Sequence, residues 1–287
     1  MQMVIYKMNE LRHKVTEIST PLRLSEYLKI RLGFSRALIT RVKFGGVYLN
    51  GECVTMRAQV NAGDEISVHF PEEASESIPP IDIPLEILYE DEHILAVNKP
   101  KNMPTHPSRG NSLPTLANAV MAHIGKGFVF RAINRLDRDT SGIVLIAKNA
   151  HSCAILSNEM KAHGFVKKYT ALLCGTPEEK HGTIDAPIER EAEGSIKRCV
   201  RSDGKRAVTE YEVKKVLDNG TSLCEFTLHT GRTHQIRVHA AYIGHPLLND
   251  FLYGTRGEDT YFLHCSSLSF THPLTKEKIE IISPPTF

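Results

Sequence analysis

The sequence predicts an α+β protein, in which a mixed, largely antiparallel sheet forms a large C-terminal domain after a small N-terminal α/β module. Strand-like segments far outnumber helical ones and do not alternate strictly with them, which argues against a parallel α/β sheet. A proline-rich, acidic stretch interrupts the chain, and 287 residues are enough for one to two domains. We therefore expect a module at 1–70, a linker at 71–84 and a second domain at 85–287.

The N-terminal module should contain two short helices followed by a small sheet. Leu24, Leu28 and Leu32 recur at helical spacing, and a glycine follows where that helix should end. Ser35 can cap a second helix, which ends at a pair of glycines. The Asn-Gly pair at 50–51, between apolar residues, is a strong signal for a tight hairpin turn.

The segment 71–84 differs in composition from both of its neighbours. It holds four prolines and four acidic residues, with little apolar patterning. Prolines restrict the backbone, so we expect a fairly stiff linker. The alternative, an irregular loop inside one domain, fits the change in composition less well.

From residue 85 onward, strand and helix patterns are mixed. Apolar runs at 94–97 and 143–147 are consistent with buried strands. Alternating apolar residues at 207–213 and 224–228 predict strands with one buried face. Thr233 can cap the last of three expected helices, which Gly244 would end. The three helices are expected at 113–124, about 150–163 and 233–243.

The positive charge of the chain is concentrated at its N-terminus. Residues 1–70 hold ten Lys and Arg against six Asp and Glu, whereas the remainder holds 25 against 27. A basic module on a nearly neutral body suggests a polyanionic partner, such as a nucleic acid. A solvated surface of the module explains this small surplus about equally well.

The sequence has no feature of a membrane or secreted protein. No stretch approaches the ~20 apolar residues of a membrane span, and the first residues lack a secretory leader pattern. The six cysteines are scattered singly. Reduced thiols in a cytoplasmic protein are therefore expected.

Several common catalytic motifs are missing from the sequence. It has no phosphate-binding loop, no dinucleotide-binding glycine pattern after a strand and no serine-hydrolase elbow. His234 and His239 are five residues apart on an expected helix, whereas two metal ligands on one helix face need a spacing of three or four. We expect no metal site.

A dense group of polar residues at 134–142 comes directly before the expected strand at 143–147. Asp137 is flanked by two arginines there, and a carboxylate near positive charge can stay ionised and act as a nucleophile. The alternative is that Asp137 and Asp139 satisfy backbone amides in a turn. For Asp139 we favour the turn; for Asp137 the residues alone leave both interpretations open.

A second polar group, at 230–239, contains Arg232 and Arg237 near the start of an expected helix. Arginines in such a place suit contacts to phosphate or carboxylate groups. Without an identified partner, surface salt bridges would be the simpler interpretation.

These two groups resemble the signatures of the RluA family of RNA pseudouridine synthases. The run RLDRDTSG at 135–142, followed by IVLIAKN, carries the first signature, and TGRTHQIRVHAAYIGHP at 230–246 carries the second. Five further segments agree with the family in order, so the resemblance covers nearly the whole chain beyond about residue 20. These are LEILYEDEHILAVNKP at 85–100, THPS at 105–108, KKYTALLCG at 167–175, GKRAVTEYEV at 204–213 and LHCSSLSFTHPLT at 263–275. Residues 21–70 separately resemble the α-L RNA-binding module that is often fused to these enzymes.

The resemblance implies the pseudouridine synthase fold and the isomerisation of uridine to pseudouridine in RNA, with no cofactor and no metal. By similarity, Asp137 is the catalytic carboxylate, and Arg237 pairs with it. Tyr169 matches the aromatic residue that stacks on the target base, and Ile236 matches the apolar residue beside that base. Arg135 matches the arginine that enters the place of the extruded nucleotide; a simple phosphate contact is the alternative.

The expected partner is therefore structured RNA. Arg232 in the catalytic domain and the basic residues of the second helix of the module, Arg36, Arg41 and Lys43, are candidates for RNA contacts. The basic segment 197–206 could line the RNA path or be a solvated loop. Ribosomal RNA, most of all that of the large subunit, is favoured because of the fused module, and transfer RNA is the alternative. We expect a monomer.

Two alternatives and two departures from the family pattern remain. A non-catalytic RNA-binding ribosome-assembly factor is a rival, although such a protein should have lost Asp137, Tyr169 or Arg237. An aspartic-protease interpretation of the segment 139–142 fails, because the spacing is wrong and no second copy exists. The chain has Asn134 where the family commonly has His, and Asn249 where Gly is usual; we expect no loss of activity from either.

Overall fold

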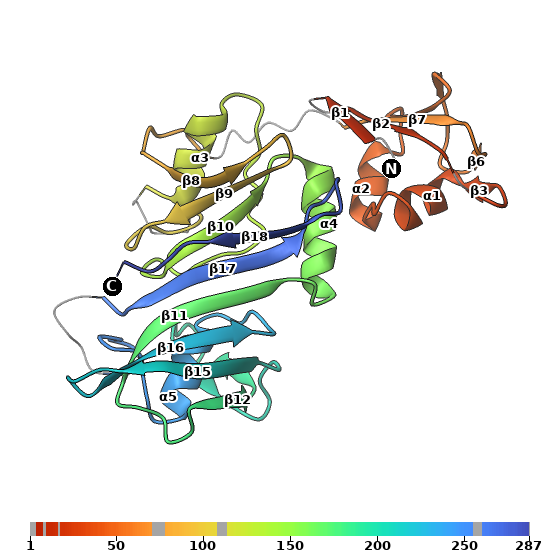
Figure 1. Ribbon diagram of the computed structural model, residues 1–287. Helices are drawn as coiled ribbons and strands as arrows, with labels where there is room; N and C mark the ends of the chain where they lie inside the picture. The colour runs from red at the N-terminus through yellow and green to blue at the C-terminus, as the bar shows by residue number, and fades with distance from the viewer. Residues whose placement is uncertain are drawn as a thin grey trace.

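The computed structural model of the protein describes residues 4–7, 10–16, 18–70, 78–107, 114–254 and 260–286. Two large hydrophobic cores lie in the described chain, one with its buried residues before 71 and one with its buried residues after 93, and a third, small cluster joins Ile188, Ala207 and Val238. Figure 1 shows a small N-terminal unit beside a much larger sheet. The division at 1–70, 71–84 and 85–287 stays a prediction, and residues 71–77 of the linker lie outside the described part of the chain.

The N-terminal unit combines an antiparallel sheet with two helices. Its five strands run in the order β1-β2-β7-β4-β5, and a two-stranded ribbon, β3-β6, lies apart from them. The helices α1 and α2 pack against each other and share one hydrophobic core with the strands. The bounds are β1 Val4–Lys7, β2 Glu10–Lys14, β3 Leu22–Arg23, α1 Leu24–Ile30, α2 Arg36–Val42, β4 Val47–Leu49, β5 Glu52–Cys53, β6 Gln59–Val60 and β7 Glu65–His69.

Local signals explain the helix start and the hairpin of this unit. The Ser35 side chain accepts a hydrogen bond from the Leu38 amide, which confirms the predicted cap of α2. Asn50 and Gly51 both have positive φ, 52° and 84°, as a tight turn between β4 and β5 requires. Strands β1 and β2 were not predicted; in β2, four of the five residues, ELRHK, are polar or charged, so it lacks the apolar alternation of a strand.

The large sheet confirms the predicted mixed, largely antiparallel architecture. Eight strands follow the order β12-β15-β16-β11-β17-β10-β9-β8, and β18 also pairs with β17. The pair β10 and β17 is parallel, and the other pairs are antiparallel. A separate ribbon joins β13 to β14. The bounds are β8 Glu86–Glu90, β9 Ile94–Lys99, β10 Ser141–Ala147, β11 Val166–Cys174, β12 His181–Asp185, β13 Ile188–Arg190, β14 Arg198–Val200, β15 Val208–Val216, β16 Thr221–Leu228, β17 Leu263–Thr271 and β18 Lys278–Ile282.

Three helices pack around this sheet where helices were expected. They are α3 Leu116–Ile124, α4 Ala150–Lys161 and α5 Gln235–Tyr242; residue 113 of the first prediction lies outside the described residues. Helix α4 packs against β10 and β17, whereas α5 packs against β14 and β15. No helix of the described chain is long and apolar enough to cross a membrane.

The predicted cap of α5 is wrong. The helix begins at Gln235, and the residue before it, His234, adopts the left-handed conformation with φ 58° and ψ 20°. The buried Gln235 side chain accepts hydrogen bonds from the Thr230 hydroxyl and the Arg232 amide, and its own amide group donates to Val208 and Thr209 of β15. This side chain fixes the turn, so the Thr233 hydroxyl is not needed as a cap.

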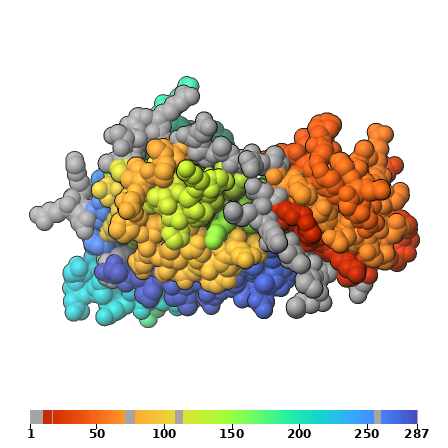
Figure 2. All heavy atoms as spheres, turned by 90° about the horizontal axis from the view of Figure 1, so that it is seen from above, coloured from red at the N-terminus to blue at the C-terminus, as the bar shows by residue number. Residues whose placement is uncertain are grey.

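The N-terminal unit contacts the large domain through α4, which Figure 1 shows between them. The Nε2–H group of His151 donates to the Leu32 carbonyl oxygen over 2.7 Å, and its ring lies 4.9 Å from that of Phe34. Ala150 and Ala154 pack against the N-terminal core. Seen from above, the N-terminal unit lies at one side of the large domain (Figure 2).

The second half of the linker, residues 78–84, has irregular conformation and lies beside α3. The Asn118 side chain donates to the Pro79 carbonyl oxygen, and the Asn118 carbonyl oxygen accepts from the Ile81 amide. Residues 78–84 are therefore held against the large domain.

Candidate active site

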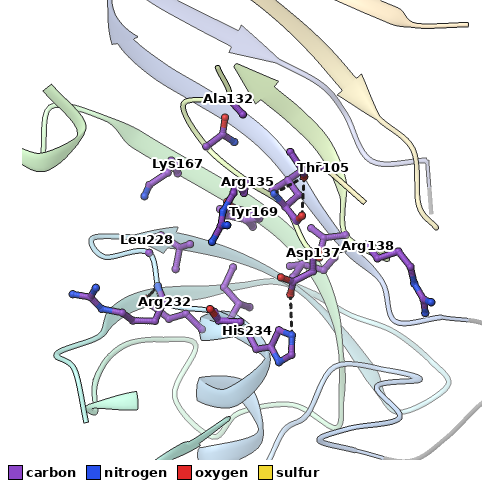
Figure 3. A pocket seen from close by; sticks show the side chains of 18 of the residues that line it. Thr105, Ala132, Arg135, Asp137, Arg138, Lys167, Tyr169, Leu228, Arg232 and His234 are labelled. Atoms are coloured by element: carbon purple, nitrogen blue, oxygen red, sulfur yellow. Dashed lines mark hydrogen bonds and ion pairs between the residues drawn. The ribbon is translucent and has the colours of Figure 1, made fainter. Parts of the chain in front are cut away.

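A pocket with a volume of about 820 Å³ opens beside β11, an inner strand of the large sheet. This volume lies in the range of small-ligand sites. Its lining comes from the loop residues 104–107, 132–138 and 140, from residues 231–237, which include the first turn of α5, and from strand β11 and its surroundings (Figure 3). Six of the residues predicted for the site line it: Arg135, Asp137, Tyr169, Arg232, Ile236 and Arg237.

The Asp137 loop is anchored on both sides of the carboxylate. Before it, the Thr105 hydroxyl donates to the Leu136 carbonyl oxygen and accepts from the Leu136 amide. After it, the buried ammonium of Lys99 donates to the Arg138 carbonyl oxygen, and to two further carbonyl oxygens of its own loop. The backbone around Asp137 is thus fixed before any substrate arrives, as precise catalysis requires.

Gly142 lets the strand that follows this loop approach β17 closely. A Cβ atom at this position would lie 2.4 Å from the Cys265 carbonyl oxygen, and its φ of 108° is one that side chains rarely allow. Gly142 pairs in parallel register with Cys265 at the start of β10. The glycine of the 135–142 motif therefore sets where the Asp137 loop ends.

Asp139 serves the loop structure, although not through the predicted backbone amides. Its buried carboxylate accepts two hydrogen bonds, each 2.9 Å long, from the guanidinium of Arg138. Asn134 is likewise structural, because its side chain donates to Ile143 and accepts from the Leu145 amide of β10. That departure from the family pattern ties the loop to the sheet.

Arg237 lies beside Asp137, but its closest partner is another carboxylate. One guanidinium nitrogen, Nη1, is 3.7 Å from Asp137 Oδ2, which places the predicted pair within ion-pair distance. Two other nitrogens donate to the fully buried Asp250 over 2.7 Å each. The Tyr261 ring lies 4.3 Å from the guanidinium carbon. Burial would lower the pKa of Arg237, but Asp250 and the neighbouring negative charges raise it above its usual range.

Asp250 was not among the predicted site residues. The turn before it contains Asn249, which adopts φ 65° in place of a glycine. Asn tolerates that conformation, so the turn is kept. Arg237 and Asp250, thirteen positions apart in the sequence, come together only through the packing of α5 and the loop after it.

His234 also faces Asp137 and was not expected to. Its Nε2 atom is 3.8 Å from Asp137 Oδ2, and Figure 3 shows the carboxylate directed toward the imidazole ring. Its Nδ1 atom is 2.7 Å from the Tyr253 hydroxyl oxygen. Burial lowers the pKa of His234, and the negative charge of Asp137 offsets part of that effect.

The other histidine of this motif points elsewhere. Nδ1 of the buried His239 lies 2.9 Å from the Thr209 hydroxyl, and its Nε2 lies 2.9 Å from the Ala186 carbonyl oxygen. Across the residues that the structure describes, no three His, Cys, Asp or Glu side chains come together as a metal site would need.

Tyr169 and Ile236 form an apolar wall of the pocket. Both are at least nine-tenths buried, and Leu228 lies near them in the lining. Burial raises the pKa of Tyr169 well above its ordinary value, and the neighbouring Cys265 thiol adds to the shift of this pKa. The phenol is therefore neutral, and the wall suits an aromatic ring of a ligand.

Basic side chains surround the opening of this pocket. Arg135, Arg138 and Arg232 are exposed and line it, and Lys167 lines it from β11. The Nε–H group of Arg232 donates to the Arg206 carbonyl oxygen. This bond holds the side chain in place and leaves the two terminal guanidinium nitrogens for a ligand.

The basic segment at 197–206 is partly neutralised by acidic neighbours. Ion pairs join Lys197 to Glu191 over 3.1 Å, Arg206 to Asp185 over 3.6 Å, and Arg201 to a nearby aspartate. This segment therefore presents less net positive charge than its sequence suggests.

Arg36, Arg41 and Lys43 do not line the pocket. They lie exposed on or just after α2 in the N-terminal unit. The Lys43 ammonium lies 4.5 Å above the ring of Phe44, which is itself 84% exposed. A basic surface with an exposed aromatic ring is typical of nucleic-acid contacts, because bases stack on such rings.

The comparisons with known proteins point to one family. A family model described as RNA pseudouridylate synthase matches residues 93–242. An uncharacterized RNA pseudouridine synthase of Bacillus subtilis, YjbO, is 45% identical over 88% of this chain and 92% of its own length. A protein of Xanthomonas campestris named ribosomal large subunit pseudouridine synthase D is 35% identical over 88% of this chain and 81% of its own.

The fold agrees with these sequence matches. The solved structure of human RNA pseudouridylate synthase domain containing 1 superimposes with a TM-score of 0.60 at 30% identity, covering 71% of this chain and 84% of the human chain. The pseudouridine synthase fold expected from the sequence motifs is thereby confirmed.

Proposed function

The chain belongs to the RNA pseudouridylate synthase family and is an RNA pseudouridine synthase, and we propose that it modifies large-subunit ribosomal RNA, with Asp137 as the reacting carboxylate and without a cofactor. The observation that carries this proposal is the position of Asp137 in the pocket. Its carboxylate lies between Arg237 and His234, in a pocket that Tyr169 also lines.

The reaction needs a carboxylate near the ribose of the target uridine. The bond between N1 and C1′ breaks, the uracil turns over, and C5 bonds to C1′; the proton of C5 is lost and N1 gains one. Asp137 could attack C1′, as the nucleophile of a retaining glycosidase does, or remove the C2′ proton. Both routes place the carboxylate beside the sugar, while Tyr169 and Ile236 hold the detached base.

The target nucleotide must leave its helix to reach this pocket. Extruding a base costs a few kcal/mol, which contacts to the rest of the RNA have to offset. Arg135 would enter the place of the extruded base, and Arg232 would contact a phosphate. On the N-terminal unit, Arg36, Arg41 and Lys43 would contact the RNA backbone.

Two observations favour large-subunit ribosomal RNA. One relative carries that substrate in its name, and the N-terminal unit has a basic surface with an exposed aromatic ring. Either ribosomal or transfer RNA would place the enzyme in the cytoplasm. Because one chain supplies the whole lining of the pocket, we expect a monomer to be active.

The experiment maps pseudouridines chemically in ribosomal and transfer RNA from a strain without this gene and from its parent. At least one large-subunit position should lose its modification in the deletion strain. Wild-type protein should restore it, whereas the D137N variant, expressed at the same level, should not. Loss confined to transfer RNA would contradict the proposed substrate, and restoration by D137N would contradict the role of Asp137.

A further inference from the structure

We propose that His234 and Tyr253 form a positioning pair, in which Tyr253 fixes the imidazole so that its Nε2–H group faces the Asp137 carboxylate. This inference rests on the proposed role of Asp137. It assigns a function to two residues of the pocket surroundings that the reaction described above does not use.

The backbone of His234 is the first observation. A non-glycine residue with φ 58° costs about 1 kcal/mol, and such strain is kept only where the surroundings impose it. His234 precedes α5 but makes no capping hydrogen bond with its side chain. The left-handed turn instead directs the ring to the pocket, where its side chain is 13% exposed.

In the proposed pair, the Tyr253 hydroxyl donates to the His234 ring and so sets which ring nitrogen carries the proton. Its oxygen accepts a hydrogen bond from the Arg198 amide over 2.9 Å. Burial raises the pKa of Tyr253 to about 12, so the hydroxyl keeps its proton and can donate it to His234 Nδ1. Nδ1 is then an acceptor, and the proton of the neutral imidazole lies on Nε2.

Arg237 alone does not align Asp137. The Nε and Nη2 atoms of Arg237 donate to Asp250, and only Nη1 faces Asp137. The negative charge of Asp250 offsets much of the positive charge of Arg237. His234 Nε2 approaches the same oxygen, Oδ2, at 3.8 Å. If both contacts shorten to hydrogen bonds, the two donors on Oδ2 orient the carboxylate and leave Oδ1 for the ribose.

Both distances to Oδ2 exceed those of a hydrogen bond, so the contacts are loose without substrate. Catalytic contacts often tighten when the substrate binds. A shift of less than 1 Å on RNA binding would turn both contacts into hydrogen bonds to a charged group. The pair should therefore affect the chemical step and not RNA affinity.

The test measures tritium release in single turnovers, with enzyme in excess over RNA labelled at uridine C5 and isolated from a strain without this gene. H234A should lower the maximal rate constant about 10- to 100-fold, the range for a hydrogen bond to a charged group. H234Q keeps an N–H donor and should recover at least half of the loss on a logarithmic scale. Y253F should lower the rate constant about 3- to 10-fold, and the double variant Y253F/H234A should be no slower than H234A.

Controls separate this role from a structural one. H229A and Y242F change an exposed histidine and an exposed tyrosine outside the pocket, and both should leave the rate constant unchanged. The dissociation constant of the RNA should stay within twofold for every variant. Thermal unfolding of each variant is measured, and if H234A does not fold, H234Q and Y253F decide the matter.

Three results would overturn the inference while D137N is inactive and the wild type is active: unchanged rate constants in H234A and Y253F, additive losses in the double variant, or H234Q as slow as H234A. A wild-type enzyme that releases no tritium would instead refute the proposed function itself.

Discussion

The floor and the rim of the pocket are built in opposite ways. The floor consists of Asp137, Tyr169, His234, Ile236 and Arg237, and the rim consists of Arg135, Arg138 and Arg232. Four of the five floor side chains are largely buried, and Asp137, at 32% exposed, sits on an anchored loop. The rim arginines are exposed. From this difference we expect the floor to determine the rate of the chemical step and the exposed rim to determine RNA binding.

The two arginines of the 230–239 motif show this contrast within six residues. Arg237 is 3% exposed and is held by two hydrogen bonds to Asp250, while Arg232 is exposed and donates one bond to a backbone oxygen. Removing the partner of a buried charge is costly, whereas removing a surface charge has little effect on stability. Substitutions at the buried Arg237–Asp250 pair should therefore change the free energy of unfolding, whereas substitutions of the rim arginines should change RNA binding.

The largest effect on stability is expected at Asp250. D250A would leave the Arg237 guanidinium buried without its main partner, and should lower the free energy of unfolding by about 3–5 kcal/mol. Urea denaturation measures this change. D185A removes an exposed carboxylate that pairs with Arg206 at 3.6 Å, and should cost less than about 1 kcal/mol. Equal losses of unfolding free energy in D250A and D185A would contradict the expected difference between a buried and an exposed ion pair.

Burial of an ionisable group should also affect stability outside the pocket, at the contact between α4 and the N-terminal unit. Burial lowers the pKa of His151 to about 4, with smaller effects from Lys276 and His93, while its hydrogen bond to Leu32 opposes the shift. In the unfolded chain the pKa is about 6.5, so the unfolded state takes up the proton first as the pH falls. The contribution of His151 is fully present above pH ~6.5 and is lost by pH ~4, which amounts to about 3 kcal/mol.

Unfolding free energies measured between pH 7 and pH 4 test this sign. H151Q removes one titrating group and should make the decline over that window smaller by about 3 kcal/mol, whereas H229A, which changes an exposed histidine, should leave it as in the wild type. The same decline in H151Q and in the wild type would show that other groups cause it.

The rim should behave differently, with effects on RNA binding. R232A should raise the dissociation constant of the RNA about 3- to 10-fold and reduce the salt dependence by about one ion, with little change in the maximal rate constant. R135A should also lower that rate constant, because Arg135 is proposed to fill the place of the extruded base. Identical kinetic effects of the two substitutions would argue against that special role.

The smallest effect is expected on the N-terminal unit. K43A should weaken RNA binding about 2- to 3-fold and lower the salt slope, without changing the rate constant. A point substitution is preferable to removal of residues 1–70, because that truncation would uncover His151 and the α4 surface. An unchanged salt slope would mean that this basic surface faces only solvent.

Local patterns predicted much of the fold. The cap at Ser35, the turn at 50–51, the three helices of the large domain and its mixed sheet follow from spacing and turn chemistry within a few residues. The motif resemblance placed six residues in one pocket. These features could be predicted because residues close to one another in the sequence determine them.

Contacts between distant residues could not be predicted in this way. Asp250 becomes the partner of Arg237 through the loop after α5, and Tyr253 reaches His234 through the same loop. His151 meets Leu32 across 119 residues of chain. The wrong cap at Thr233 has the same origin, because the side chain that fixes that turn is itself held by β15.

The most direct test of the account compares the single-turnover rate constant and the RNA dissociation constant of D137N with those of the wild type. Replacing the reacting oxygen by an amide should lower the rate constant at least about a thousandfold, while the dissociation constant stays within twofold. A rate constant within tenfold of the wild type, with RNA still bound, would contradict the assignment of Asp137 as the reacting group.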